Sequence, residues 1–181
     1  AAGAPRRPVR RFVLLVAASL ALTAAALLAP PLPAATTVPA PESVLGFVPG
    51  EDRKLATWGQ VLEYLKALDA ASDRLSVEEV GRTTLGRPFV VVTVTSEANH
   101  RHLEEIRRAN ARLASPRGLD DEEAERLVRG GKTVVAMAFS IHSTEVGGTL
   151  TALRLLHRLA ASDDERVRAM LDQVVLLVIP S

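Results

Sequence analysis

The alternation of apolar and polar positions after residue 53 predicts a helix followed by a β-hairpin. Apolar side chains recur at steps of three and four residues over 55–68, with charged residues between them, as in an amphipathic helix. Two β-rich runs, 75–80 and 89–95, flank a stretch that contains Gly and Pro at 81–88, which favours an antiparallel hairpin with a long turn. We expect the helix to cover one face of a sheet.

The next two helices are rich in charge. One is expected over 102–113, and a shorter one begins after Asp120, whose side chain, with Glu123 three positions later, forms a capping-box pattern. This second helix should stop at Gly130 and Gly131. Because both helices are charged, we expect them to be solvated and peripheral.

The segment 133–141 is almost continuously apolar, which predicts a strand covered on both faces at the centre of the sheet. A helix over 145–161 and an apolar strand over 174–179 follow, and this order predicts a parallel crossover. The last strand is expected at an exposed edge. The fold class is therefore α/β, with a mixed parallel and antiparallel sheet flanked by helices, in a chain long enough for one domain.

The N-terminal segment has the layout of a signal peptide. Four arginines precede an apolar run over 12–29, and prolines and small residues follow it. An uncleaved membrane anchor formed by 12–29 is the alternative. We therefore assign 1–35 to a signal peptide or anchor, 36–52 to a linker rich in Pro, Thr and Ala, and 53–181 to the folded domain. The protein is expected to be exported, either secreted, periplasmic or membrane-anchored.

Composition excludes several kinds of site. Aromatic residues make up 3% of the chain, and acidic residues outnumber basic ones after residue 40, so a nucleic-acid partner is not expected. The chain has no Cys, which excludes disulfides and thiolate zinc sites. Any metal would have to be held by His and carboxylate side chains.

His142 and Glu145 are the candidate metal ligands. Ligands of an open α/β sheet bind beyond the carboxyl ends of its parallel strands, and His142 stands where the 133–141 strand ends. Glu145 should lie in the first turn of the next helix, where the helix dipole favours its ionised form. The two side chains could then share a zinc ion, and Gly147 and Gly148 would allow close packing behind them.

The same spacing also fits a purely structural role. Ser143 or Thr144 could cap the helix, Glu145 could complement its dipole, and His142 could be a polar strand end. The other histidines do not supply a third ligand. His157 lies about 18 Å further along the predicted helix, and His100 and His102 are expected to be surface residues.

The string Ser-Ile-His142-Ser-Thr-Glu145-Val-Gly-Gly resembles the HxxE zinc motif of the M14 zinc carboxypeptidases. The stretches 41–53 and 86–89 are similar to the opening of secreted bacterial members, so the resemblance spans about 41–181. It implies a carboxypeptidase-like fold and Zn²⁺ held by His142 and Glu145, where the metal activates water and polarises a peptide carbonyl. The substrate would be a peptide or protein, and a membrane would be a partner only through an uncleaved N-terminal segment.

The resemblance also implies what the chain does not supply. In the family, the third ligand, a His, and the general-base Glu come from later strands, so we expect a truncated catalytic domain that is inactive alone. Thr144 stands where digestive members carry an Arg that helps to bind substrate, which leaves a zinc deacylase or amidase on the same scaffold as an alternative. An exported, non-catalytic binding domain is a further alternative.

Overall fold

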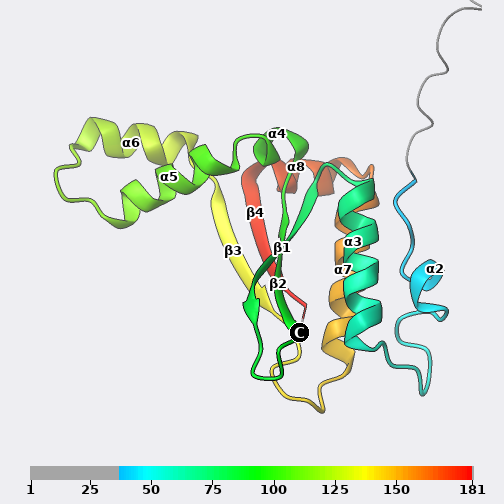
Figure 1. Cartoon of the computed structure of the whole chain (residues 1–181). Helices are drawn as coiled ribbons and strands as arrows, with labels where there is room; N and C mark the ends of the chain where they lie inside the picture. Colours follow the sequence, from blue (N-terminus) through cyan, green and yellow to red (C-terminus); the bar gives the residue numbers. More distant parts are fainter. Residues whose placement is uncertain (1–36, 181) are drawn as a thin grey trace, which may run out of the picture. The chain divides into compact units, whose positions relative to one another are not determined.

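The computed structural model describes residues 37–180 (Figure 1). The predicted signal peptide or anchor, 1–35, lies outside the described residues. Within 37–180, no helix combines the length and the hydropathy needed to cross a membrane.

The core of the fold is a four-stranded mixed sheet. Its strands are β1 (Leu75–Arg82), β2 (Pro88–Val94), β3 (Thr133–Ala138) and β4 (Val174–Ile179), in the order β1-β2-β4-β3. β1 pairs with β2 and β2 with β4 in antiparallel fashion, whereas β3 and β4 are parallel. The predicted hairpin, the parallel crossover and the mixed α/β fold class are therefore confirmed.

Two long helices, α3 (Trp58–Ala71) and α7 (Gly147–Ala161), pack side by side next to the sheet (Figure 1). Their buried side chains form one core with those of the strands, including Leu65, Leu68, Leu153, Leu156, Val92 and Val178. α3 starts later than the apolar spacing suggested, because Thr57 caps it. The Thr57 side chain accepts from the Gln60 main-chain N–H, and the Gln60 side chain accepts from the Thr57 N–H.

The charged helices α5 (Leu103–Ala114) and α6 (Asp121–Gly130) extend away from the sheet, as predicted (Figure 1). Neither buries a residue against the rest of the described chain. The Asp120 cap is confirmed, since its carboxylate accepts from the Glu123 main-chain N–H at 2.7 Å. The described residues contain three further helices that were not predicted: α2 (Glu42–Leu45), α4 (Glu97–His100) and α8 (Glu165–Gln173). The first two have only four residues each, which is too short for a periodic pattern to appear.

The position predicted for the strand 133–141 is wrong. β3 ends at Ala138 and occupies an edge of the sheet, with Val134 44% and Val135 38% exposed. The central place belongs to β4, the strand expected at the edge, because the hairpin strand β2 pairs along its other side. Within residues 37–180, the outer edge of β3 has no partner. An apolar run predicts a strand, but it does not predict which strands will pair on either side of it.

Part of the segment predicted as a linker, 36–52, packs against the core. Leu45 is 4% exposed and belongs to the core cluster, which Val38, Val44 and Phe47 also contact. The Tyr64 hydroxyl donates to the Pro39 carbonyl oxygen at 3.1 Å. The apolar residues between the prolines give this segment enough surface to bury, so it behaves as part of the domain.

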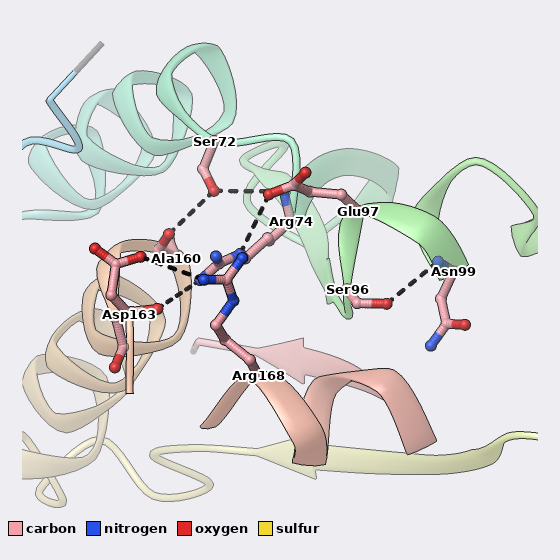
Figure 2. Close-up of polar contacts among 9 residues, drawn as sticks. Ser72, Arg74, Ser96, Glu97, Asn99, Ala160, Asp163 and Arg168 are labelled. Carbon is pink, nitrogen blue, oxygen red and sulfur yellow. Dashed lines mark hydrogen bonds and ion pairs between the residues drawn. The ribbon is translucent and has the colours of Figure 1, made fainter. Parts of the chain in front are cut away.

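Polar contacts fasten the end of the sheet where β1 begins (Figure 2). Arg74, whose side chain is 11% exposed, donates from Nη1 to the Ser162 carbonyl oxygen at 2.7 Å and lies 3.6 Å from Glu97 through Nε. This arrangement ties the strand to the C-terminal end of α7 and to α4. A buried amide adds to it, because Asn99 Nδ2 donates to the carbonyl oxygens of Leu171 and Asp172, both at 3.0 Å.

Candidate metal centre

The candidate site lies on the loop between β3 and α7, at the carboxyl ends of the two parallel strands (Figure 1). Strand pairing continues one residue past β3, since the Phe139 N–H donates to the Ile179 carbonyl oxygen at 3.0 Å. The chain then turns at Ser140, which has a φ of +55°. The location predicted from the strand pattern is therefore confirmed.

The loop brings His142 and Glu145 into direct contact. Nδ1 of His142 lies 2.7 Å from Oε1 of Glu145, and the His142 main-chain N–H donates to Oε2 at 3.2 Å. A third contact closes the turn, because the Glu145 N–H donates to the His142 carbonyl oxygen at 3.0 Å. The His142 side chain is 73% exposed and that of Glu145 is 53% exposed, so both can be reached from solvent.

The contact with His142 stabilises the ionised form of the Glu145 carboxyl. The side-chain hydrogen bond from His142, reinforced by its main-chain N–H, lowers the pKa of the Glu145 carboxyl below its ordinary value. The predicted position of Glu145 in the first helical turn is wrong, because α7 begins at Gly147 and Glu145 precedes the N-cap residue, Val146. A glutamate carboxyl with a pKa of 4.5 or below is ionised near neutral pH, as a metal ligand has to be.

The alternative in which Ser143 or Thr144 caps the helix is wrong. The N-cap residue is Val146, which makes no side-chain cap hydrogen bond in the described structure. The hydroxyl of Ser140 takes that place, accepting from the Thr149 N–H at 2.9 Å and donating to the Glu145 carbonyl oxygen at 2.8 Å. Ser140 was missed by the sequence analysis.

An apolar wall adjoins the His142 and Glu145 side chains. Both residues line a hollow of about 200 Å³ whose other lining residues include Leu55, Trp58, Val146 and Leu150. The Trp58 ring is fixed by a hydrogen bond from Nε1 to a main-chain carbonyl oxygen of β2 at 3.2 Å. These residues were also missed, since spacing along one helix does not show which loop will lie opposite it.

The other histidines do not contribute to this site. His102 lies 3.3 Å from Glu105 at the start of α5. The Nε2 atom of His100 is buried and has no hydrogen-bond partner among the described residues, so His100 is not the simple surface residue that was predicted. Within residues 37–180, no group of three or more His, Asp or Glu side chains could hold a metal ion.

Comparison with known proteins identifies the family. The family model described as zinc carboxypeptidase, peptidase M14, matches residues 61–181. The chain belongs to the zinc carboxypeptidase family. The matched range includes the whole β3–α7 loop, and the resemblance to the family inferred from the loop sequence is confirmed. No curated protein matches the chain.

Solved structures of carboxypeptidases are also similar to this member of the family. Carboxypeptidase A from Helicoverpa armigera shares 15% identity at a TM-score of 0.48, with 77% of this chain and 29% of that chain covered. A metallo-carboxypeptidase from Burkholderia cenocepacia shares 20% identity at a TM-score of 0.48, with 70% and 27% covered. The chain thus spans less than a third of the length of these proteins.

The residues present fit the zinc that the family implies. Zn²⁺ in proteins binds imidazole nitrogen and carboxylate oxygen, and catalytic sites use three protein ligands with an open position. An imidazole and an ionised carboxylate meet at the β3–α7 loop, both exposed to solvent. If zinc binds at this loop, this pair would supply two such ligands.

Proposed function

We propose that the protein is a zinc-dependent metallocarboxypeptidase that hydrolyses peptide bonds, with His142 and Glu145 as two of its metal ligands. The observation that carries the proposal is the 2.7 Å contact between His142 Nδ1 and Glu145 Oε1. This contact lies at the carboxyl ends of the parallel strands, in a chain of the zinc carboxypeptidase family.

The residues of the loop prepare a site for a divalent cation. Zinc bound there would supply Lewis-acid chemistry, polarising the scissile carbonyl and lowering the pKa of water. Glu145 contributes a negative charge at neutral pH, and the contact with His142 extends its ionised form to lower pH. Apolar residues line the hollow beside the pair, as is typical of ligand sites, while both side chains of the pair stay exposed to solvent.

A complete site needs more than these two ligands. We propose that a third ligand, a His, and a general-base carboxylate come from outside the described residues, since 37–180 holds no third metal-binding side chain near the pair. Loss of a general base alone lowers a rate by about 10²–10⁴-fold. The isolated chain is therefore expected to be catalytically inactive.

The test compares two histidine variants of the full-length protein. His142→Ala should abolish zinc stoichiometry, measured by elemental analysis, together with peptide hydrolysis. His102→Ala is the matched control, because His102 is an exposed histidine at the N-cap of α5, outside the candidate site; it should retain both. A His142→Ala protein that keeps its full zinc content would overturn the proposal.

The substrate class is tested separately. Thr144 precedes Glu145, where digestive members of the family carry an Arg, and this favours testing a zinc deacylase as the second candidate. The full-length enzyme should cleave the C-terminal residue from blocked peptides faster than it hydrolyses N-acyl amino acids. The reverse order of kcat/KM would favour the deacylase, and absence of both activities and of zinc would favour a binding domain.

We propose further that the protein is exported. Four arginines followed by the apolar run 12–29 support a signal peptide or an anchor. Fractionation of expressing cells should place the protein outside the cytoplasm, and N-terminal sequencing of the mature protein would separate cleavage from anchoring. Recovery of the intact N-terminus in the cytoplasm would contradict export.

A further inference from the structure

Ser140 adopts a backbone conformation that is unfavourable for its residue type. Its φ is +55°, in the left-handed region that residues with a Cβ seldom occupy. The residue follows the last strand-like hydrogen bond after β3 and precedes the His142–Glu145 turn. Such a conformation persists where surrounding contacts compensate for it, and it often marks a functional position.

The compensating contacts all involve the Ser140 hydroxyl. It donates to the Glu145 carbonyl oxygen at 2.8 Å and accepts from the Thr149 N–H at 2.9 Å, and Thr149 Oγ1 lies 3.2 Å away. The Thr149 N–H belongs to the first turn of α7, where main-chain donors have no partner within the helix. Because the N-cap residue Val146 cannot accept, Ser140 supplies this bond from the end of the strand.

The helix approaches Ser140 so closely that a side chain at Gly148 would not fit. A Cβ at Gly148 would lie 2.5 Å from Ser140 Oγ and 2.8 Å from the Ser140 main-chain nitrogen, both shorter than normal contacts. At the neighbouring Gly147, no described atom lies within 4 Å of the corresponding position. The first turn of α7 therefore rests directly on Ser140.

We propose that Ser140 is a positioning residue of the metal site, which acts by holding the main chain of Glu145 against the first turn of α7. The Glu145 carbonyl oxygen also accepts from the Gly148 N–H at 3.0 Å, so two bonds fix the peptide next to the carboxylate. The His142 and Glu145 side chains are too exposed for packing to orient them. Hydrogen bonds are what keep the carboxylate facing the imidazole.

This inference rests on the proposed metal site, and the first experiment measures Zn²⁺ affinity of the full-length protein by competition titration. Ser140→Gly removes the hydroxyl while tolerating the positive φ, so the variant should fold with a thermal midpoint close to that of the parent. Its Kd for Zn²⁺ should rise about 10–100-fold, the usual effect of removing a residue that orients metal ligands. Ser140→Ala should show the same loss of affinity.

Ser143→Ala is the matched control. It removes a serine hydroxyl from the same loop, and the Ser143 side chain has no hydrogen-bond partner among the described residues. Its zinc affinity should stay within about twofold of the parent. A Ser140→Gly protein with the parental zinc affinity would overturn the inference, as would an equal loss in Ser143→Ala.

A second measurement needs no metal. Amide hydrogen exchange of this chain, followed by NMR, reports the protection of two main-chain N–H groups. One is the Thr149 N–H, which donates to the Ser140 hydroxyl, and the other is the His142 N–H, which donates to the Glu145 carboxylate. In Ser140→Gly, both should exchange about fivefold faster or more, as expected for loss of a hydrogen bond. Faster exchange at Thr149 with unchanged exchange at His142 would show that Ser140 caps α7 without positioning the site.

Zinc affinity and amide exchange together distinguish failure of the metallopeptidase proposal from failure of the role proposed for Ser140. If the parent binds no zinc but both amides lose protection in Ser140→Gly, the metallopeptidase proposal fails, whereas the role of the Ser140 hydroxyl in holding the His142–Glu145 turn stands. If zinc binds and depends on His142 but not on Ser140, the positioning role fails alone.

Discussion

Nδ1 of His142 lies 2.7 Å from Oε1 of Glu145, and the main-chain N–H of His142 donates to the other carboxylate oxygen at 3.2 Å. One residue thus contacts both oxygens of the carboxylate. The geometry of the pair comes from hydrogen bonds and the turn at Ser140 rather than from burial.

The ionisation of Glu145 should depend on His142. In His142→Ala the pKa of the Glu145 carboxyl should rise towards its ordinary value of 4.5, because both bonds that stabilise the carboxylate are weakened or lost. In the parent, the lowered pKa means that the interaction stabilises the protein above about pH 4.5 and is lost as pH falls through the lowered value. Side-chain carboxyl ¹³C NMR measures the shift, and His102→Ala is the control. Identical Glu145 titration curves in parent and His142→Ala would contradict this account.

The two adjacent glycines of α7 should respond differently to alanine. Gly148→Ala should lower the free energy of unfolding by about 1–3 kcal/mol, since the new Cβ meets main-chain atoms of Ser140 that cannot move easily. Gly147→Ala should be neutral or stabilise by up to about 1 kcal/mol, because the site is open and Ala favours helix. Urea unfolding of both variants measures the difference. Equal effects would show that the helix does not rest on Ser140.

Tyr64, the single tyrosine of the chain, should ionise only in strongly alkaline solution. Burial raises the pKa of its hydroxyl well above the ordinary value of 10, and the nearby Glu42 carboxylate adds to the effect. Because the folded state favours the neutral phenol, this contribution to stability is present below pH 10 and is lost as pH rises towards the raised value. Absorbance at the phenolate band should therefore rise only together with unfolding. Ionisation near pH 10 with a native circular dichroism spectrum would contradict the packing of 37–49 on α3.

The buried Asn99 amide should be a stability determinant. It donates to Thr95 Oγ1 at 3.1 Å and to the Leu171 and Asp172 carbonyl oxygens. Asn99→Ala removes these bonds, although the Leu171 oxygen still accepts from the Ser96 N–H at 3.1 Å, and should cost about 1–3 kcal/mol of unfolding free energy. Asn110→Ala is the control, since the Asn110 amide makes a single long hydrogen bond at 3.4 Å. A cost no greater than that of the control would show that water replaces the amide at this end of the sheet.

Several elements follow directly from local patterns in the sequence. Three elements have the predicted type and similar bounds: the hairpin of β1 and β2, the strand β4 and the helix α6. Each follows from a local signal, because side-chain alternation marks the hairpin, an apolar run marks β4 and the capping Asp120 marks the start of α6. The HxxE spacing likewise predicted that His142 and Glu145 would meet, since a tight turn brings residues three apart together.

Other features depend on segments that are distant in the sequence. The edge position of β3 depends on which strand pairs with β4, and the burial of Leu45 depends on the apolar surface that α3 presents. Neither partner is encoded in the pattern of the segment itself. The same holds for Trp58, which lines the site from a helix far upstream of the loop.

The sequence by itself determined the types of most elements, the place of the candidate ligands after a strand, and the family to which they belong. Only the tertiary structure decided the strand order, the packing of the supposed linker and the role of Ser140. The physical reason is the sequence distance over which each interaction acts. Helix periodicity, strand alternation and capping act over a few residues. The close packing and hydrogen bonding at Ser140 instead depend on where Gly148 and Thr149 lie when α7 packs against the sheet.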